Sequence, residues 1–68
     1  MNLKKGNRVA WYRYDDHLTD KQRYGTVVSQ SYDRYLTTVK WDNGVTTEVI
    51  TGYLESEADV RRHFRNER

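Results

Sequence analysis

The sequence predicts a mainly β domain that ends in a short α-helix. Three observations lead to this prediction. Short runs of residues alternate between apolar and polar, four glycines fall where such runs begin or turn, and the last segment changes to charged residues with helical spacing. With 68 residues the chain makes one domain. We therefore expect a small barrel of four to five antiparallel strands in residues 1–55, with residues 56–68 as a helix packed on it.

Strands are expected in four runs, at residues 7–14, 24–32, 34–41 and 45–50. Asn43 and Gly44 should join the last two runs in a tight turn, because both residues tolerate a positive φ angle. The alternation predicts a core built from Val9, Trp11, Val39, Trp41, Val45 and Val49. Residues 51–54 break the pattern and should turn the chain so that Leu54 returns to this core.

Two segments lack the strand pattern. Residues 15–23 are polar and without period, which predicts a long exposed loop. In the C-terminal segment, Ser56 precedes Asp59 by three residues, as in a capping box with a shorter acid. Val60 and Phe64 then share one helical face. This segment should therefore form a helix that packs through its two apolar side chains.

Composition excludes several classes of protein. The absence of cysteine rules out disulfides and fits a reducing cytoplasm. Because the chain has two histidines and no thiolate, we expect no structural metal and no cofactor. No apolar stretch is long enough for a signal peptide or a membrane span. We expect a cytoplasmic protein that does not enter membranes and is a monomer or a weak homo-oligomer.

Catalysis is not expected. Asp15 and Asp16 lie beside His17, and a carboxylate–imidazole pair can carry out general acid–base chemistry. These residues are consecutive in a polar loop of a chain too small for a deep pocket, so a solvated loop is the simpler interpretation. The sequence has no phosphate-binding glycine loop and no nucleophile motif. We interpret it as a binding module and not as an enzyme.

Five short motifs mark the expected strands: "GNRV" (6–9), "GTVV" (25–28), "VKWDNG" (39–44), "EV" (48–49) and the returning Leu54. Together they resemble the SH3-like small β-barrels, above all the Tudor-like and KOW-like members. Such barrels serve many unrelated functions, so the resemblance implies a fold more than an activity. A plasmid-borne dihydrofolate reductase is another such barrel, but "TEVI" (47–50) lacks the Gln and Tyr of its pore motif.

The resemblance to Tudor-like domains implies a further kind of site. Those domains often hold methylated lysine or arginine in an aromatic cage, where cation–π attraction supplies the binding energy. The walls of such a cage would come from Tyr12, Tyr14, Tyr32, Tyr35 and Tyr53.

The first candidate ligand is nucleic acid or a nucleic-acid-handling complex. The formal net charge is +2, but basic residues gather near both ends of the chain. Arg61 and Arg65 share a helical side, spaced to follow a phosphate backbone, and exposed aromatic rings could stack on unpaired bases. The predicted nucleic-acid-binding residues are Lys4, Lys5, Arg8, Arg61, Arg62 and Arg65.

The alternative is a protein-interaction module that binds and modulates a host enzyme. Its expected surface is the groove between loop 15–23 and the hairpin tip, with an acidic rim that faces a basic partner. Tyrosine, tryptophan and arginine also dominate interface energetics. In size and style the chain resembles small proteins of bacteriophages and mobile elements. The predicted protein-binding residues are Asp15, Asp16, Asp20, Tyr14 and Tyr53.

Overall fold

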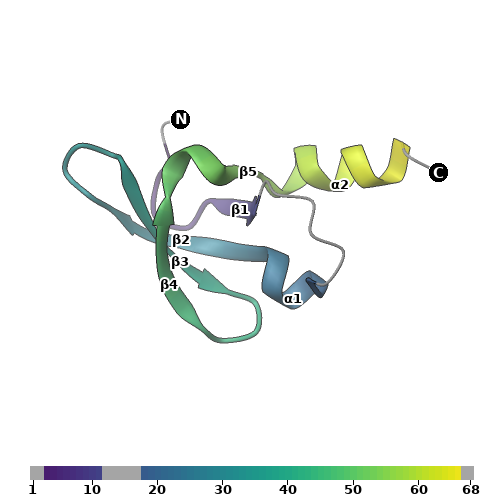
Figure 1. Cartoon of the computed structure of the whole chain (residues 1–68), viewed down its shortest axis with the longest axis horizontal. Coiled ribbons are helices and arrows are strands. Elements are labelled where there is room, and N and C mark those ends of the chain that lie inside the picture. Colours follow the sequence, from purple (N-terminus) through teal and green to yellow (C-terminus); the bar gives the residue numbers. More distant parts are fainter. Residues whose placement is uncertain (1–2, 12–17, 67–68) are drawn as a thin grey trace.

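The structure, a computed structural model, describes residues 3–11 and 18–66, with side chains as far as His63. Five strands form one antiparallel sheet, followed by a C-terminal helix (Figure 1). The strands are β1 (Arg8–Trp11), β2 (Tyr24–Gln30), β3 (Leu36–Trp41), β4 (Thr46–Ile50) and β5 (Leu54–Ser56). The helices are α1 (Asp20–Arg23), the 3-10 turn η1 (Thr51–Tyr53) and α2 (Glu57–Asn66). The mainly β class with a short C-terminal helix is confirmed.

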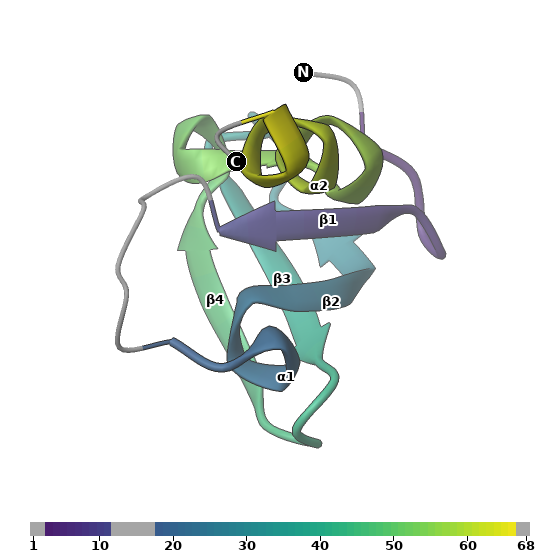
Figure 2. The same cartoon turned by 90° about the vertical axis from the view of Figure 1, so that its right-hand side faces the viewer.

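The sheet has the strand order β4-β3-β2-β1-β5 and is open, so β4 and β5 are its two edges. Strands β2, β3 and β4 follow one another as a meander, and β5 returns to pair with β1. The sheet curves strongly, and α2 lies across its β1 side (Figure 2). Among the described residues, no helix has the length and apolar character needed to cross a bilayer.

The main core lies on one face of this sheet. Its buried members are Val9, Val27, Val39, Trp41 and Leu54, with Leu3, Trp11 and Val49 packed against them. The predicted core therefore holds except at Val45, whose side chain is 51% exposed. Val45 precedes the first residue of β4, at the end of the hairpin, where its side chain is exposed to solvent. The predicted core did not include Val27, because the alternation of apolar and polar residues in its run did not distinguish it from its neighbours.

A second, smaller cluster lies behind β1. Ala10 and Tyr24 are buried there with Val60 of α2. Successive residues of a strand point to opposite faces, so Val9 enters the main core while Ala10 faces the helix. The prediction that α2 packs through Val60 is confirmed, whereas the side chain of Phe64 lies outside the described ones. At the helix start, Asp59 N donates to Ser56 Oγ at 3.1 Å, which confirms Ser56 as the capping residue.

The β3–β4 turn differs in type from the predicted one. Among the described residues of this turn, Gly44 alone has a positive φ angle, +91°, and Asn43 does not. Gly44 N donates to Trp41 O at 2.9 Å, and Trp41 N donates to Val45 O at 2.8 Å. This is the three-residue loop in which a type I turn is followed by a left-handed glycine. The prediction was therefore right about Gly44 and wrong about Asn43.

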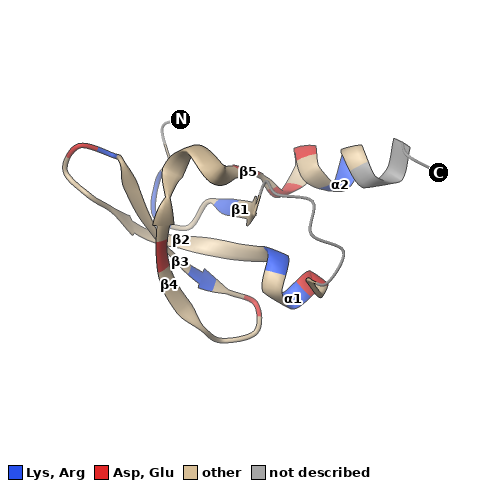
Figure 3. Cartoon of the chain, viewed as in Figure 1, with Lys and Arg blue, Asp and Glu red and all other residues tan. Residues whose placement is uncertain are grey.

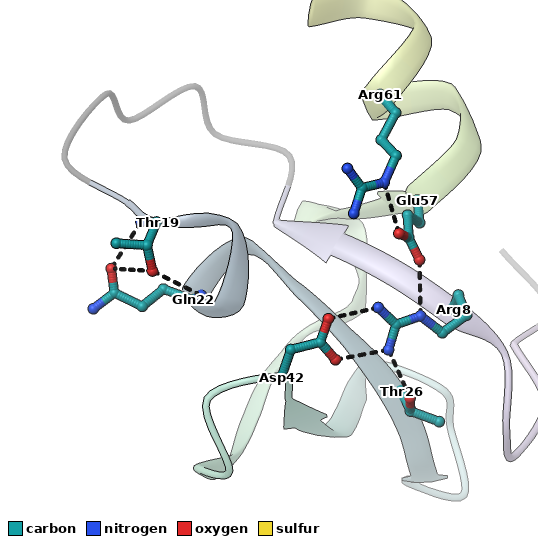
Figure 4. Close-up of polar contacts among 7 residues, drawn as sticks. All are labelled: Arg8, Thr19, Gln22, Thr26, Asp42, Glu57 and Arg61. Carbon is teal, nitrogen blue, oxygen red and sulfur yellow. Dashed lines mark hydrogen bonds and ion pairs between the residues drawn. The ribbon is translucent and has the colours of Figure 1, made fainter.

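The expected loop 15–23 is partly helical. Residues 20–23 form α1, and residues 15–17 lie outside the described part of the chain. Thr19 Oγ1 accepts from Gln22 N at 3.3 Å, while Thr19 N donates to Gln22 Oε1 at 2.9 Å (Figure 4). This reciprocal pair is a capping box. The sequence contained this Thr-x-x-Gln signal, and the loop prediction overlooked it.

Candidate functional site

Arg8, one of the predicted nucleic-acid-binding residues, is the centre of a network of ion pairs (Figure 4). Its Nη1 and Nη2 donate to the two carboxylate oxygens of Asp42 at 2.8 and 2.7 Å. Its Nε donates to Glu57 Oε1 at 2.8 Å, and Nη1 also reaches Thr26 Oγ1 at 3.0 Å. One guanidinium therefore joins β1 to the β3–β4 turn and to the first residue of α2.

Arg61 extends this network along α2. Its Nε donates to Glu57 Oε2 at 2.7 Å, so the same carboxylate accepts from two arginines. The Arg61 guanidinium also lies 4.1 Å from the ring centre of Tyr24, which is a cation–π distance. We call Arg8, Asp42, Glu57 and Arg61 the arginine network. It fastens α2 to the sheet beside the buried Val60.

The network shifts the pKa values of its members in the directions expected for ion pairs. Hydrogen bonds from Arg8 and then from Arg61 hold the pKa of Glu57 below its ordinary value. The hydrogen bond from Arg8 likewise lowers the pKa of Asp42. The pKa of Arg8 is raised, first by its bonds to Asp42 and then by that to Glu57. The ionised forms on both sides are therefore favoured by folding.

This linkage predicts how stability depends on pH. A carboxylate with a lowered folded pKa adds stability that is present above its ordinary pKa and is lost as the pH falls through the folded value. We expect the melting temperature to fall as the pH drops from 5 to 2, and to fall less steeply in Arg8→Met. Arg62→Met is the matched control, because Arg62 pairs only with the half-exposed Asp59 among described partners. Equal pH slopes in the wild type and Arg8→Met would contradict the role of the network.

The predicted basic residues do not form one patch. Arg8 and Arg61 meet through Glu57, and Arg62 pairs with Asp59 at 3.3 Å. Lys4 and Lys5 precede β1 and are exposed, with no carboxylate partner among the described residues, and the side chain of Arg65 is not described. Acidic and basic segments interleave over α2, α1 and the β3–β4 turn (Figure 3). The surface around the three described arginines is thus locally neutral.

The predicted acidic rim is described only in part. Tyr14, Asp15 and Asp16 lie outside the described residues. Asp20 is the exposed first residue of α1. Tyr53 lies in η1, where its ring packs at a tilt against Trp11 with 5.6 Å between ring centres. Of the three predicted loop aspartates the structure therefore describes Asp20 alone, and α1 lies directly against the β3–β4 turn, where Asn43 N donates to Lys21 O at 3.0 Å.

A surface pocket of about 410 Å³ lies at the corner where β4 turns into β5. We call it the tyrosine pocket. It is lined by Arg34, Tyr35, Ile50, Thr51, Gly52, Leu54 and Glu55. No local sequence pattern predicts this pocket, because its walls come from two segments more than ten residues apart. Of the tyrosines expected in an aromatic cage, Tyr35 lines this pocket, and Tyr12 and Tyr14 are not described.

The wall carrying Arg34 and Tyr35 is held in a defined shape. Arg34 has φ +62°, a left-handed conformation that few residues other than glycine adopt. Asp33 Oδ1 accepts from Ser31 Oγ at 2.7 Å and from Tyr35 N at 3.0 Å. These two bonds lower the pKa of Asp33, that from Ser31 most. Arg34 N donates to Ser31 O at 2.9 Å, which closes the turn.

The opposite wall rests on buried hydrogen bonds. Thr51 N donates to Tyr35 O at 2.9 Å, which ties the two walls together. The hydroxyls of Thr37 and Thr51, both buried, are 2.6 Å apart, and Gln30 Nε2 donates to Thr37 Oγ1 at 3.1 Å. The pocket is therefore preformed by the fold, while Tyr35 at its rim remains 60% exposed.

The described residues show no arrangement for metal binding. They contain no group of three or more His, Asp or Glu side chains placed to hold an ion. His63 is exposed on α2, and the "DDH" stretch at 15–17 lies outside the described residues. Residues 47–50, compared above with a reductase pore motif, belong to the edge strand β4.

Comparisons with protein-family models, with curated proteins and with solved structures found no match to this chain.

Proposed function

We propose that the chain is a non-enzymatic binding module that binds a segment of another protein at the tyrosine pocket. The pocket carries this proposal. Its volume falls within the range of about 300–1,000 Å³ that is common for ligand sites. Ile50 and Leu54 are apolar members of its lining, and Tyr35 is an aromatic one. Arg34 and Glu55 put opposite charges on its lining, which suits a polypeptide segment better than a polyanion.

The arginine network supports a protein ligand over nucleic acid. A phosphate that binds Arg8 must compete with Asp42 and Glu57, which already accept its hydrogen bonds. Much of the energy of binding to nucleic acid comes from counterions. The nucleic acid releases them when unpaired cations of the protein neutralise its phosphates. Because Arg8, Arg61 and Arg62 are paired within the chain, they offer less of this energy than their number suggests.

Nucleic acid is a second candidate because of three exposed side chains outside the arginine network. Lys4 and Lys5 are exposed and have no carboxylate partner among the described residues. Tyr32, in the β2–β3 loop, is fully exposed. Lysines for phosphate and a free ring for stacking are the two elements of a single-strand binding surface.

We also propose that the sheet is a member of the SH3-like small barrels. Three observations support this proposal. Gly25 enters β2 in close contact with β3, the β3–β4 hairpin turns at residues 42–44, and β5 returns to pair with β1. The first two of these belong to the motifs on which the resemblance rests.

Selection from a displayed library of random twelve-residue peptides tests the proposed function. We expect it to yield peptides whose affinity falls about tenfold or more in Tyr35→Ala, as at interface hot spots. Tyr32→Ala is the matched control, because Tyr32 is exposed but does not line the pocket. Fluorescence anisotropy of labelled peptides measures both. Failure to select any peptide, or equal binding by Tyr35→Ala, would overturn the proposal.

The second candidate needs its own assay. Labelled single-stranded and duplex oligonucleotides are titrated at low and moderate salt, with Lys4→Ala/Lys5→Ala and Arg61→Ala/Arg62→Ala as paired variants. Binding that weakens steeply with salt and is lost in the lysine variant would favour nucleic acid. Absence of binding at low salt would exclude it.

A further inference from the structure

Strand β4 is an edge whose outward hydrogen-bonding groups can be assigned. Trp41 N donates to Val45 O at 2.8 Å just before β4, and Thr51 N donates to Tyr35 O at 2.9 Å just after it. In an antiparallel pair, bonded and non-bonded positions alternate. The continuous register between these two bonds therefore turns the main-chain groups of residues 47 and 49 toward β3. Those of residues 46, 48 and 50 point away from the sheet.

The outward N–H groups have no partner among the described residues, whereas the carbonyl of Ile50 belongs to the 3-10 turn η1 as its N-cap. The hydrogen bonds of the described chain include none from the main-chain N–H groups of Thr46, Glu48 or Ile50. Three N–H donors and the carbonyl acceptors of Thr46 and Glu48 therefore lie along one side of β4. Such a row is a template for pairing with another extended chain.

Strand β4 also lacks two of the usual protections of an edge, a proline and a bulge. It contains no proline, and its register with β3 runs without a bulge from Leu36↔Ile50 to Lys40↔Thr46. A register shift occurs instead between β2 and β3, in the interior of the sheet. The other edge, β5, is only three residues long and leads directly into α2. Short edges and covered edges are protected, so β4 is the accessible one.

The tyrosine pocket is continuous with this edge. Ile50 is the last residue of β4 and also lines the pocket. A chain paired with β4 would therefore reach the pocket at the C-terminal end of the strand. Glu48 is the charged residue of β4, while the pocket lining carries one charge of each sign, Arg34 and Glu55.

Charge complementarity identifies the occupant. Two copies of β4 paired antiparallel about Glu48 would set two carboxylates directly opposite each other, which is destabilising. A partner with lysine or arginine at that position would instead form a cross-strand pair of opposite charge. This argues against a second copy of the chain and for a basic extended segment.

We propose that the bound protein segment adds to β4 as a sixth strand, with a basic side chain opposite Glu48 and an apolar side chain in the tyrosine pocket. This inference rests on the proposed function, because it specifies how the ligand of the same pocket is held. Main-chain hydrogen bonds to β4 supply affinity, and the pocket and Glu48 supply specificity.

Two measurements with a selected library peptide test the inference. The first is hydrogen exchange in the wild-type protein, followed by NMR. In the free protein the amides of Thr46, Glu48 and Ile50 should exchange fast and those of Thr47 and Val49 slowly. With saturating peptide the three fast amides should become protected. Unchanged exchange at these amides would overturn strand addition.

The second measurement uses proline to remove one outward donor. Glu48→Pro deletes an N–H that makes no bond to β3, and proline is tolerated on edge strands. Glu48→Ala is the matched control, since it removes the carboxylate and keeps the N–H. We expect Glu48→Pro to bind the peptide about fivefold or more weakly than Glu48→Ala, because a hydrogen bond is lost. Equal affinities would overturn the inference, and the exchange measurement decides if Glu48→Pro fails to fold.

The outcomes separate this inference from the proposed function. A peptide whose binding depends on Tyr35 but leaves the β4 amides unprotected would retain the pocket and overturn strand addition. If no peptide binds, the proposed function fails as well. Protection of the same amides by concentration-dependent dimerisation, or by an oligonucleotide, would replace the basic protein segment with another occupant and overturn the proposal.

Discussion

Replacing Trp41 with alanine is expected to lower the free energy of unfolding by about 3–5 kcal/mol, which is most of the stability of a domain of this size. Trp41 is 8% exposed and packs in the main core with Val9 and Val39. Its Nε1 also donates to Thr47 Oγ1 at 2.8 Å, so the substitution removes a hydrogen bond together with the ring. Urea denaturation followed by far-UV circular dichroism measures the loss.

Two controls make this prediction specific. Trp41→Phe keeps an aromatic ring in the core and should lose clearly less stability than Trp41→Ala. Trp11→Ala removes a tryptophan that is only partly buried, at the margin of the same core. If Trp11→Ala costs as much as Trp41→Ala, the assignment of Trp41 to the centre of the core is wrong.

Gly25→Ala is expected to destabilise the protein by about 1–3 kcal/mol through overpacking. A β-carbon at Gly25 would lie 2.7 Å from Lys40 O and 2.7 Å from Val39 Cγ1, and 3.0 Å from Trp41 Cα. Two of these atoms belong to the backbone of β3, so strands β2 and β3 would have to move apart. The melting temperature should fall by several degrees, as measured by circular dichroism.

Gly52→Ala is the matched control for Gly25→Ala. A β-carbon at Gly52 would meet nothing within 4 Å, and the position has no positive φ angle. Alanine should therefore be nearly neutral there or slightly stabilising, because it restricts the unfolded chain. A loss at Gly52→Ala equal to that at Gly25→Ala would show that the cost does not come from the contact with β3.

The local parts of the fold could be predicted from the sequence. Period-two alternation identified the strands, and the Ser56 capping signal identified the start of α2, because both depend on residues close in the chain. The prediction was wrong where the burial of a residue depends on its position in the tertiary structure. Val45 continues the alternation of β4, yet it lies at the hairpin end and is exposed.

The candidate site could not be predicted in the same way. Arg8 pairs with residues 34 and 49 positions away, and no local pattern announces such contacts. The basic residues were recognised as charged but not as paired within the chain. The pocket depends on the left-handed conformation of Arg34, a residue that gives no turn signal comparable to glycine. Lys4 and Lys5 stay predicted nucleic-acid-binding residues, because no described carboxylate pairs with either side chain.

The long separations within the arginine network also bear on the kinetics of folding. A contact between distant positions forms only when the chain between them closes into a loop. The conformational entropy of that loop must be lost before the contact stabilises the fold. We expect the pairs of Arg8 with Asp42 and Glu57 to be largely absent from the folding transition state. Interactions of that kind slow unfolding and have little effect on the folding rate. The network would then determine how long each folded molecule persists, more than how quickly it forms.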